Sequence, residues 1–206
     1  MKLFRNRQSA GKLLANKLKA IKADIILGIP RGGVVVASEV AKILKLPLDI
    51  IVTRKIGAST QPELALGALD SEGQAVWDEE LLSALQLDAE DLKEKIEEER
   101  QEISRREKLY RQGKKLLDIR GKTIILVDDG MATGATTQVA IEYLKRHQAR
   151  VILAVPIASQ SALEKVEDEV EQVVVLEAPA YFQAVGQFYH QFEPVTDQEV
   201  IQLLNG

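Results

Sequence analysis

The sequence predicts an α/β protein with a doubly wound, mainly parallel five-stranded sheet. Five short apolar runs have the length and composition of strands that are buried on both faces: 24–29, 48–53, 123–127, 151–156 and 173–176. Segments with helical spacing of apolar residues separate most of these runs. Strands that alternate with helices form parallel sheets with right-handed crossovers. A charged stretch at 79–117 interrupts the alternation, and we interpret it as a helical insertion.

The composition fits one globular domain that covers residues 1–206. A hydrophobic content of 46% is sufficient for a real core, and a net charge of −4 gives no sign of a nucleic-acid partner, which would need a basic surface. The chain has no cysteine and two histidines, which excludes disulfides and metal sites rich in thiolates or histidines. No apolar run approaches the ~20 residues of a membrane helix, and the N-terminus lacks a signal-peptide core. We therefore expect a cytoplasmic protein without a membrane partner.

The N-terminal part contains two predicted helices around the first strand. Ala10, Leu14 and Leu18 recur at helical spacing, and Asn6 precedes them as a candidate N-cap. We expect this helix to cover the sheet. The apolar segment 34–44 predicts the second helix.

Two segments without helical spacing follow the second predicted strand. Glycine, proline and small polar residues mark 54–63 as a loop. Short alternating apolar pieces at 64–78, interrupted by Gly67 and Gly73, predict a small hairpin that extends the edge of the sheet. Trp77 is expected to pack there.

The insertion at 79–117 contains two predicted helices, and Asp88 is the candidate N-cap of the second. The apolar stripe of the second helix consists of Leu92, Ile96, Ile103 and Tyr110. Acid-first charge pairs four residues apart surround the stripe and support a solvated helix. Because the stripe buries little, we expect the helix to lie across the domain or against a second subunit of a homodimer.

The most informative stretch follows the predicted strand at 123–127. Asp128 and Asp129 stand at its carboxyl end, which is where ligands bind in open α/β sheets. A loop of small residues then leads into a helix: Ala132, Thr133, Gly134, Ala135 and Thr136. Free N–H groups and the positive end of the helix dipole make such a loop a phosphate site. Carboxylates beside a phosphate site suggest a ligand rich in hydroxyls, such as a sugar phosphate.

A second loop, Pro30-Arg31-Gly32-Gly33, ends the first predicted strand. Consecutive glycines let a ligand approach the main chain, and Arg31 adds a forked cation that suits phosphate oxygens. If the strands have the flavodoxin-like order 2-1-3-4-5, the strands at 24–29 and 123–127 are neighbours at the switch point. Their loops would then face each other across one crevice.

The acidic pair and the loop after it resemble the phosphoribosyl pyrophosphate (PRPP) motif of the type I phosphoribosyltransferases. The resemblance implies that Asp128 and Asp129 hold the ribose 2′- and 3′-hydroxyls, and that the loop 132–136 binds the 5′-phosphate. Pro30–Gly33 resembles the pyrophosphate loop of the family, which often carries a non-proline cis peptide. We assign that bond to Arg31–Gly32. The implied cofactor is Mg²⁺, held mainly through PRPP.

The same resemblance gives roles to three further segments. The family places a mobile loop after the second core strand, which implies that Arg54 and Lys55 contact PRPP and that Arg31 and Lys55 are catalytic residues at the leaving pyrophosphate. A variable hood completes the active site, and here residues 1–20 and 178–206 would form it. In the aromatic tail, Tyr181 and Phe182 are the candidate acceptor contacts.

The implied reaction is Mg²⁺-dependent transfer of the phosphoribosyl group of PRPP to a nitrogenous base or related small-molecule acceptor. Family members that act on 6-oxopurines carry an acid at the first loop residue, which is Ala132 here. This departure argues against a hypoxanthine–guanine enzyme and leaves adenine, orotate, uracil or another acceptor open. Two alternatives remain: a non-catalytic PRPP-binding sensor or regulator, and another sugar-phosphate enzyme on a similar sheet.

Overall fold

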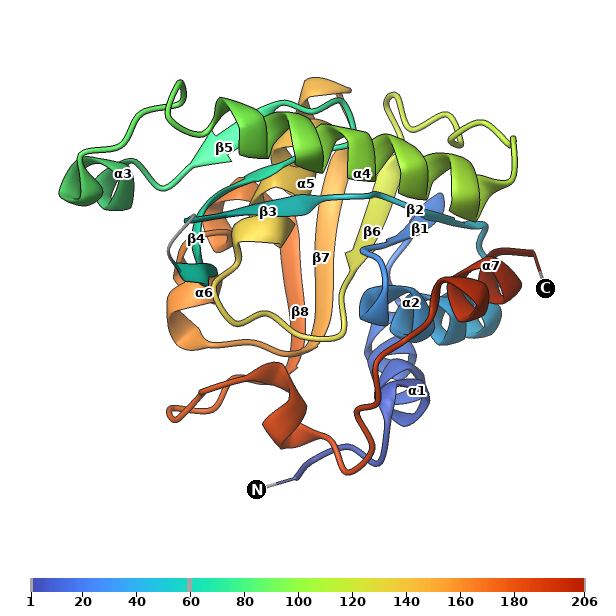
Figure 1. Ribbon diagram of the computed structural model, residues 1–206. Coiled ribbons are helices and arrows are strands. Elements are labelled where there is room, and N and C mark those ends of the chain that lie inside the picture. Colours follow the sequence, from blue (N-terminus) through green and yellow to red (C-terminus); the bar gives the residue numbers. More distant parts are fainter. Residues whose placement is uncertain (1, 59–60, 206) are drawn as a thin grey trace.

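A sheet of five parallel strands forms the centre of the fold (Figure 1). The structure, a computed structural model, describes residues 2–58 and 61–205, and at 58 and 61–65 it describes the backbone alone. The sheet consists of β1 (Ile25–Gly28), β2 (Leu48–Ile50), β6 (Thr123–Val127), β7 (Arg150–Ile157) and β8 (Gln172–Glu177). Its order, β2-β1-β6-β7-β8, is the predicted one. Since β1 and β6 pair with Gly28 opposite Val127, the loops that follow them leave the sheet side by side.

Helices cover both faces of the sheet, as the continuous apolar strands predict. α1 (Arg7–Leu18) and α2 (Gly32–Leu44) pack on the face that contains Ile125. α5 (Ala135–Arg146) and α6 (Gln160–Glu164) pack on the opposite face, which contains Ile124. The side-chain alternation of β6 therefore divides its apolar residues between two cores.

Asn6 caps α1 as predicted. Its Oδ1 accepts a hydrogen bond from the Ser9 amide at 2.9 Å, and Ser9 Oγ accepts one from the Asn6 amide at 3.1 Å. This reciprocal arrangement satisfies two N–H groups at the helix start.

A second, antiparallel sheet contains β3 (Arg54–Ala58), β4 (Gln61–Leu69) and β5 (Ala75–Trp77), in that order. The predicted hairpin at 64–78 is confirmed by the antiparallel pairing of β4 with β5, but it belongs to this separate sheet and not to the edge of the main sheet. The prediction of a loop at 54–63 was wrong, because Arg54–Ala58 forms β3 and β4 begins at Gln61; residues 59–60 lie outside the described residues. Ile56, Leu66 and Leu69 are buried in one cluster between this sheet and its neighbours. Their burial stabilises strands whose glycines lower the local preference for extended structure.

The insertion forms α3 (Glu79–Leu85) and α4 (Lys93–Arg111), and α4 lies across the second sheet (Figure 1). Ile103 and Tyr110 are buried against that sheet, so the apolar stripe packs within the chain. The N-cap prediction was wrong: α4 begins after Leu92, because the Asp88 carboxylate is held in a preceding turn by the amides of Glu90 and Asp91. The homodimer stays a prediction.

The C-terminal part of the chain contains the remaining helices and turns. α6 ends at Glu164, and a 3₁₀ turn at Glu167–Glu169 follows it before β8. A second 3₁₀ turn, Val185–Phe188, lies in the aromatic tail, and α7 (Asp197–Asn205) packs beside α4 and α2. Within the described ranges, no helix is both long and apolar enough to cross a membrane.

Asp49 anchors the insertion to the main sheet, and its loss should destabilise the protein. Its Oδ1 accepts from Arg111 Nε at 3.2 Å, where both side chains are buried, and its Oδ2 accepts from the amide of the exposed Leu117 at 3.0 Å. Asp49→Ala leaves the Arg111 charge buried with one partner fewer, so we expect the free energy of unfolding to fall by roughly 3 kcal/mol. Urea denaturation measures this change.

The matched control is Glu107→Gln, because Glu107 is the other carboxylate that pairs with Arg111, at 3.0 Å, and is half-buried. We expect this variant to lose less than about 1 kcal/mol. Equal losses in the two variants would contradict the anchoring role of Asp49.

Candidate active site

The two predicted ligand loops lie in direct contact at the carboxyl ends of β1 and β6. A methyl group placed on Gly32 would collide with Asp129 Oδ2, and one placed on Gly33 would lie 2.8 Å from the Cα of Asp128. Only residues without a side chain permit this approach. The Pro30–Gly33 loop and the acidic pair therefore form one site, as their positions after neighbouring strands predict.

The loop between β6 and α5 borders a cavity of about 160 Å³. The cavity wall includes Lys55 and Asp128, and its remaining members are Gly130, Met131, Ala132, Thr133, Gly134, Thr136, Thr137 and Val185. Gly134 is the N-cap of α5 and has φ +81°, a conformation that favours glycine. The turn aims the first amides of α5 and the positive end of its dipole at the cavity, which suits phosphate.

The acidic pair is half-buried, and its partial removal from water raises the pKa of both carboxyls. For Asp128 the charge of Asp129 raises the pKa further, whereas Lys55 opposes the shift. For Asp129 the guanidinium of Arg7 opposes the effect of burial on the pKa. Asp128 Oδ1 also accepts a hydrogen bond from the Asp129 amide at 2.8 Å. The site thus holds two hydrogen-bonding carboxyl groups whose charge the surrounding cations offset in part.

Arg7, at the start of α1, is a site residue that the sequence did not reveal. Its Nε donates to Asp129 Oδ2 at 2.6 Å, and its Nη1 donates to the carbonyl oxygen of Glu193 at 2.8 Å. Its guanidinium also lies 3.8 Å from the ring centroid of Phe192. A cation in the first turn of a helix opposes the helix dipole, and that mismatch was the one available signal.

Arg31 extends from the loop toward α7 and α4. Its Nη1 lies 3.6 Å from Asp197 Oδ1, and that same oxygen accepts a hydrogen bond from the buried Tyr110 hydroxyl at 2.7 Å. The cis peptide of this loop is Pro30–Arg31, which corrects the assignment to Arg31–Gly32. The C-terminal helix therefore pairs with the Arg31 side chain, and the insertion holds that partner in place through Tyr110.

The two adjacent basic residues of β3 separate, because successive side chains of a strand point to opposite faces. Lys55 lines the cavity beside Asp128. Arg54 instead donates from Nε to Glu99 Oε2 of α4 at 2.6 Å. The structure thus brings Lys55, but not Arg54, to the cavity wall, and a contact between Arg54 and PRPP stays a prediction.

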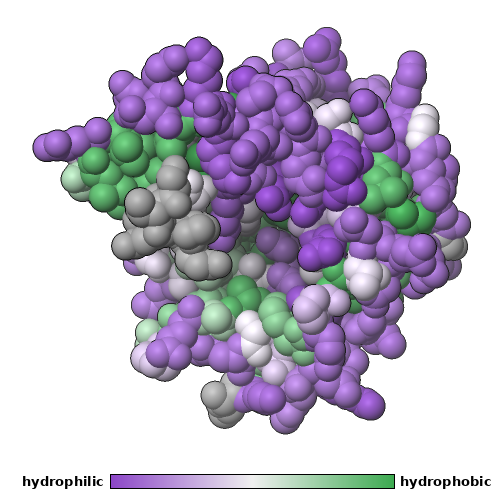
Figure 2. Space-filling model, in the orientation of Figure 1, coloured by the Kyte–Doolittle hydropathy of each residue, from purple (hydrophilic) through white to green (hydrophobic). Residues whose placement is uncertain are grey.

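The aromatic tail, which precedes α7, contacts the acidic pair through Tyr189. Tyr189 is buried, and its hydroxyl donates to the backbone carbonyl of Asp129 at 2.5 Å. The ring of Phe182 lies 5.0 Å from that of Phe188, whereas Tyr181 is 70% exposed. Figure 2 shows a hollow on this face between the hydrophilic side chains of α4 and a hydrophobic patch below them.

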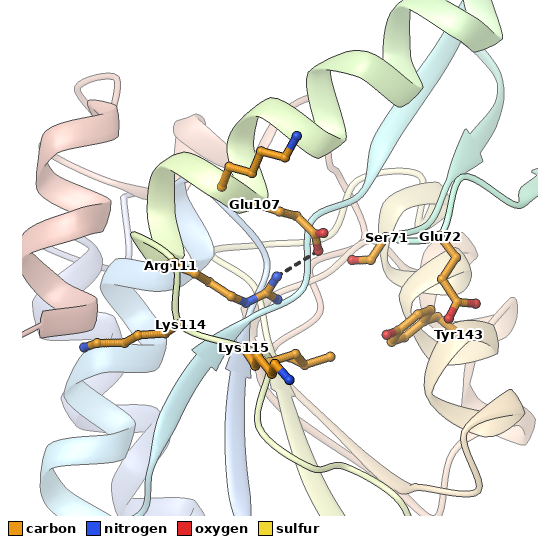
Figure 3. Close-up of a pocket in the computed structure, with 10 residues that line it drawn as sticks. Ser71, Glu72, Glu107, Arg111, Lys114, Lys115 and Tyr143 are labelled. Atoms are coloured by element: carbon orange, nitrogen blue, oxygen red, sulfur yellow. Dashed lines mark ion pairs between the residues drawn. The ribbon is translucent and has the colours of Figure 1, made fainter.

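A larger cavity, about 450 Å³, lies at the far end of α5 (Figure 3). The last turn of α4 and the lysines after it line one side, and Tyr143 lines the other, with burial raising its pKa to about 12. Arg111 there is occupied by Asp49 and Glu107. Cations at the C-terminus of a helix stabilise its free carbonyl groups, which accounts for the basic side chains at the end of α4. The cavity contains none of the predicted site residues.

The family follows from comparison with known proteins. A family model for the phosphoribosyl transferase domain matches residues 3–193. The chain belongs to this family. Proteins from two Mycobacterium tuberculosis strains, CDC 1551 / Oshkosh and ATCC 25618 / H37Rv, bear the name of phosphoribosyl transferases and are 41% identical over 208 residues. The chain spans about half of their length (47%) and matches them along all of its own.

Solved structures share the fold of this phosphoribosyl transferase domain. The crystal structure of TT1426 from Thermus thermophilus superposes with a TM-score of 0.82 at 39% identity, over 99% of this chain and 98% of that chain. A purine phosphoribosyltransferase from Pyrococcus horikoshii has a TM-score of 0.52 at 18% identity over 92% of each chain, which shows the shared fold alone. The predicted type I phosphoribosyltransferase fold is confirmed.

Replacing Arg7 should make the stability of the unliganded protein more sensitive to pH. The folded state binds protons at Asp129 more tightly than the unfolded chain does, because burial raises its pKa. Stability contributed by this group is therefore fully present below the unfolded pKa of about 4 and is lost as pH rises through the folded pKa. Arg7→Met removes the charge that opposes the shift, so we expect a steeper loss.

Urea denaturation from about pH 5 to about pH 8 measures this slope. Arg5→Met is the control, because Arg5 is an exposed arginine of the same segment whose side chain forms no hydrogen bond or ion pair within the described residues. Parallel pH curves for Arg7→Met and the wild type would contradict the role of Arg7 at Asp129.

Proposed function

We propose that this domain transfers the phosphoribosyl group of PRPP to a nitrogenous base or related acceptor and releases pyrophosphate. The observation that carries the proposal is the contact of the Gly32–Gly33 loop with Asp128 and Asp129 beside the anion cavity at α5. A ligand with two phosphate-bearing ends joined by a hydroxyl-rich ring matches that layout. Family membership supports a pentosyltransferase.

Each part of PRPP has a proposed place. The 5′-phosphate binds at the N-terminus of α5 in the loop 132–136, where free amides and the helix dipole favour an anion. The ribose hydroxyls bind Asp128 and Asp129. The pyrophosphate binds the Gly32 and Gly33 amides, with Arg31 and Lys55 as cations.

The donor set fits Mg²⁺ that is held mainly by its ligand. Among the residues that the structure describes, no group of three or more acids and histidines is arranged to hold a metal ion. Mg²⁺ keeps several waters and commonly binds one or two carboxylates plus substrate phosphates. Asp128 and Asp129 would hold it, directly or through water. When bound, it neutralises charge on the pyrophosphate.

The reaction exchanges one bond at C1′ for another. The bond between C1′ and the pyrophosphate oxygen breaks, and its electron pair leaves with pyrophosphate. The lone pair of the acceptor nitrogen forms the new bond to C1′, and the proton that this nitrogen carries passes to water. Arg31, Lys55 and the loop amides stabilise charge on the leaving group, and the carboxyls of Asp128 and Asp129 fix the ribose, so orientation and electrostatics supply the catalysis.

The acceptor is proposed to bind between the acidic pair and the two terminal segments, 1–20 and 178–206, as a hood. Phe182 is the better placed of the two predicted aromatic contacts, because it packs in the tail cluster that also contains Val185 of the cavity wall. Tyr181 is largely exposed and would have to turn inward to reach an acceptor. Ala132 supplies no acid for the N7 side of a 6-oxopurine, which favours another acceptor.

Removing both carboxylates should abolish PRPP binding. Asp128→Asn with Asp129→Asn keeps the side-chain volume but removes the paired acceptors that hold two hydroxyls, so we expect no measurable binding of PRPP with Mg²⁺ in calorimetry. Asp168→Asn is the charge control, since Asp168 is exposed in the turn Glu167–Glu169. Wild-type affinity in the double variant would refute the ribose assignment.

Pyrophosphate release separates an enzyme from a non-catalytic PRPP-binding sensor. The wild-type protein is incubated with PRPP, Mg²⁺ and a panel of bases that includes adenine, orotate and uracil. Release that depends on one base supports the transferase and names its acceptor. PRPP binding without release for any base supports the sensor.

A further inference from the structure

Thr137 carries a buried hydroxyl group in the wall of the 160 Å³ cavity at the N-terminus of α5. The residue is 1% exposed, and its Oγ1 finds no hydrogen-bond partner anywhere in the described part of the chain. Nearly all buried polar atoms in folded proteins are paired, because an unpaired one loses its bond to water without compensation. The hydroxyl of Thr137 is therefore a donor that still needs an acceptor.

The position of Thr137 links this donor to the anion site. It lies in the first turn of α5, directly after the loop 132–136, and it lines the same cavity as Thr133, Thr136 and Lys55. A threonine in a helix commonly donates back to the carbonyl oxygen three or four residues earlier. Thr137 makes no such bond within the described residues, so the helix backbone does not occupy its hydroxyl.

Rotation about χ1 is the route by which the Thr137 hydroxyl would face a ligand in the cavity that the residue lines. The methyl and hydroxyl groups of threonine have similar volumes, and threonine in helices populates two χ1 rotamers. A change of χ1 that puts the hydroxyl where the methyl group was would make the cavity wall more polar and leave its packing nearly unchanged.

We propose that Thr137 is a phosphate-binding residue whose hydroxyl turns into the cavity and donates to a phosphate oxygen at the N-terminus of α5. This inference rests on the proposed function in one respect: it takes that phosphate to be the 5′-phosphate of PRPP. Thr137 thereby adds a side-chain donor to the loop amides, in the cavity that Lys55 also lines.

Thr137→Val tests the proposal through two effects of opposite sign. In the ligand-free protein the change removes a buried unpaired hydroxyl at constant volume, so the thermal unfolding midpoint should rise. In calorimetry the affinity for ribose 5-phosphate, and for PRPP with Mg²⁺, should fall about tenfold, because a hydrogen bond to a charged oxygen is lost. Thr137→Ser keeps the hydroxyl and should keep the affinity.

Thr53→Val is the matched control. Thr53 carries the other buried hydroxyl without a partner among the described residues, is 6% exposed and does not line this cavity. Its replacement should also raise the unfolding midpoint but should leave both affinities unchanged. The comparison separates the general benefit of removing an unpaired hydroxyl from a specific loss of phosphate binding.

Three results decide the proposal. Unchanged affinity of Thr137→Val for ribose 5-phosphate overturns it, as does an equal loss of affinity in Thr53→Val. Loss of affinity in Thr137→Val with retention in Thr137→Ser supports it. Inorganic phosphate is the independent probe: if the wild type binds phosphate but not PRPP, and Thr137→Val weakens phosphate binding, Thr137 is a phosphate ligand and the proposed function fails.

Discussion

The site depends on one steric constraint, the contact of Gly32 with the carboxylate of Asp129. Parallel pairing of β1 with β6 sends their two loops out of the sheet side by side, and the Ile29 amide bonds the Val127 carbonyl at 2.9 Å just before they diverge. At that separation a side chain on Gly32 would collide with Asp129. The contact makes a pyrophosphate loop and a sugar-phosphate loop into parts of one proposed site.

The rest of the chain supports this contact from outside the main sheet. Arg7 of α1 pairs with Asp129, and Tyr189 of the tail bonds its backbone. On the other side, Tyr110 of α4 fixes the Asp197 carboxylate beside Arg31. The insertion was predicted to lie across the domain or against a second subunit; it packs over the second sheet, and Tyr110 connects it to Arg31 through Asp197. Removing it would alter the site as well as any assembly.

The features that could be predicted from the sequence are those carried by neighbouring residues. Buried strands appear as continuous apolar runs, and the acidic pair and glycine loops carry their chemistry in adjacent residues, so sheet order and both motifs were predictable. The hairpin at 64–78 was predicted, but the third strand, β3, and the separation of this sheet from the main one were missed, because Gly57 interrupts the alternation of β3 and burial under α4 stabilises it. Arg7 was missed because its partner, Asp129, is distant in the sequence. Thr137 was missed because only the folded chain shows that its hydroxyl is unpaired and that it lines a cavity.

The most direct test of the central claim is PRPP binding by Gly32→Ala, measured by calorimetry with Mg²⁺. Alanine suits the first turn of α2, so circular dichroism should report an intact fold. The added methyl group must displace the Asp129 carboxylate from Arg7, and we therefore predict that PRPP binding is lost. Wild-type affinity in a folded Gly32→Ala protein would contradict the claim that the two loops form a single PRPP site.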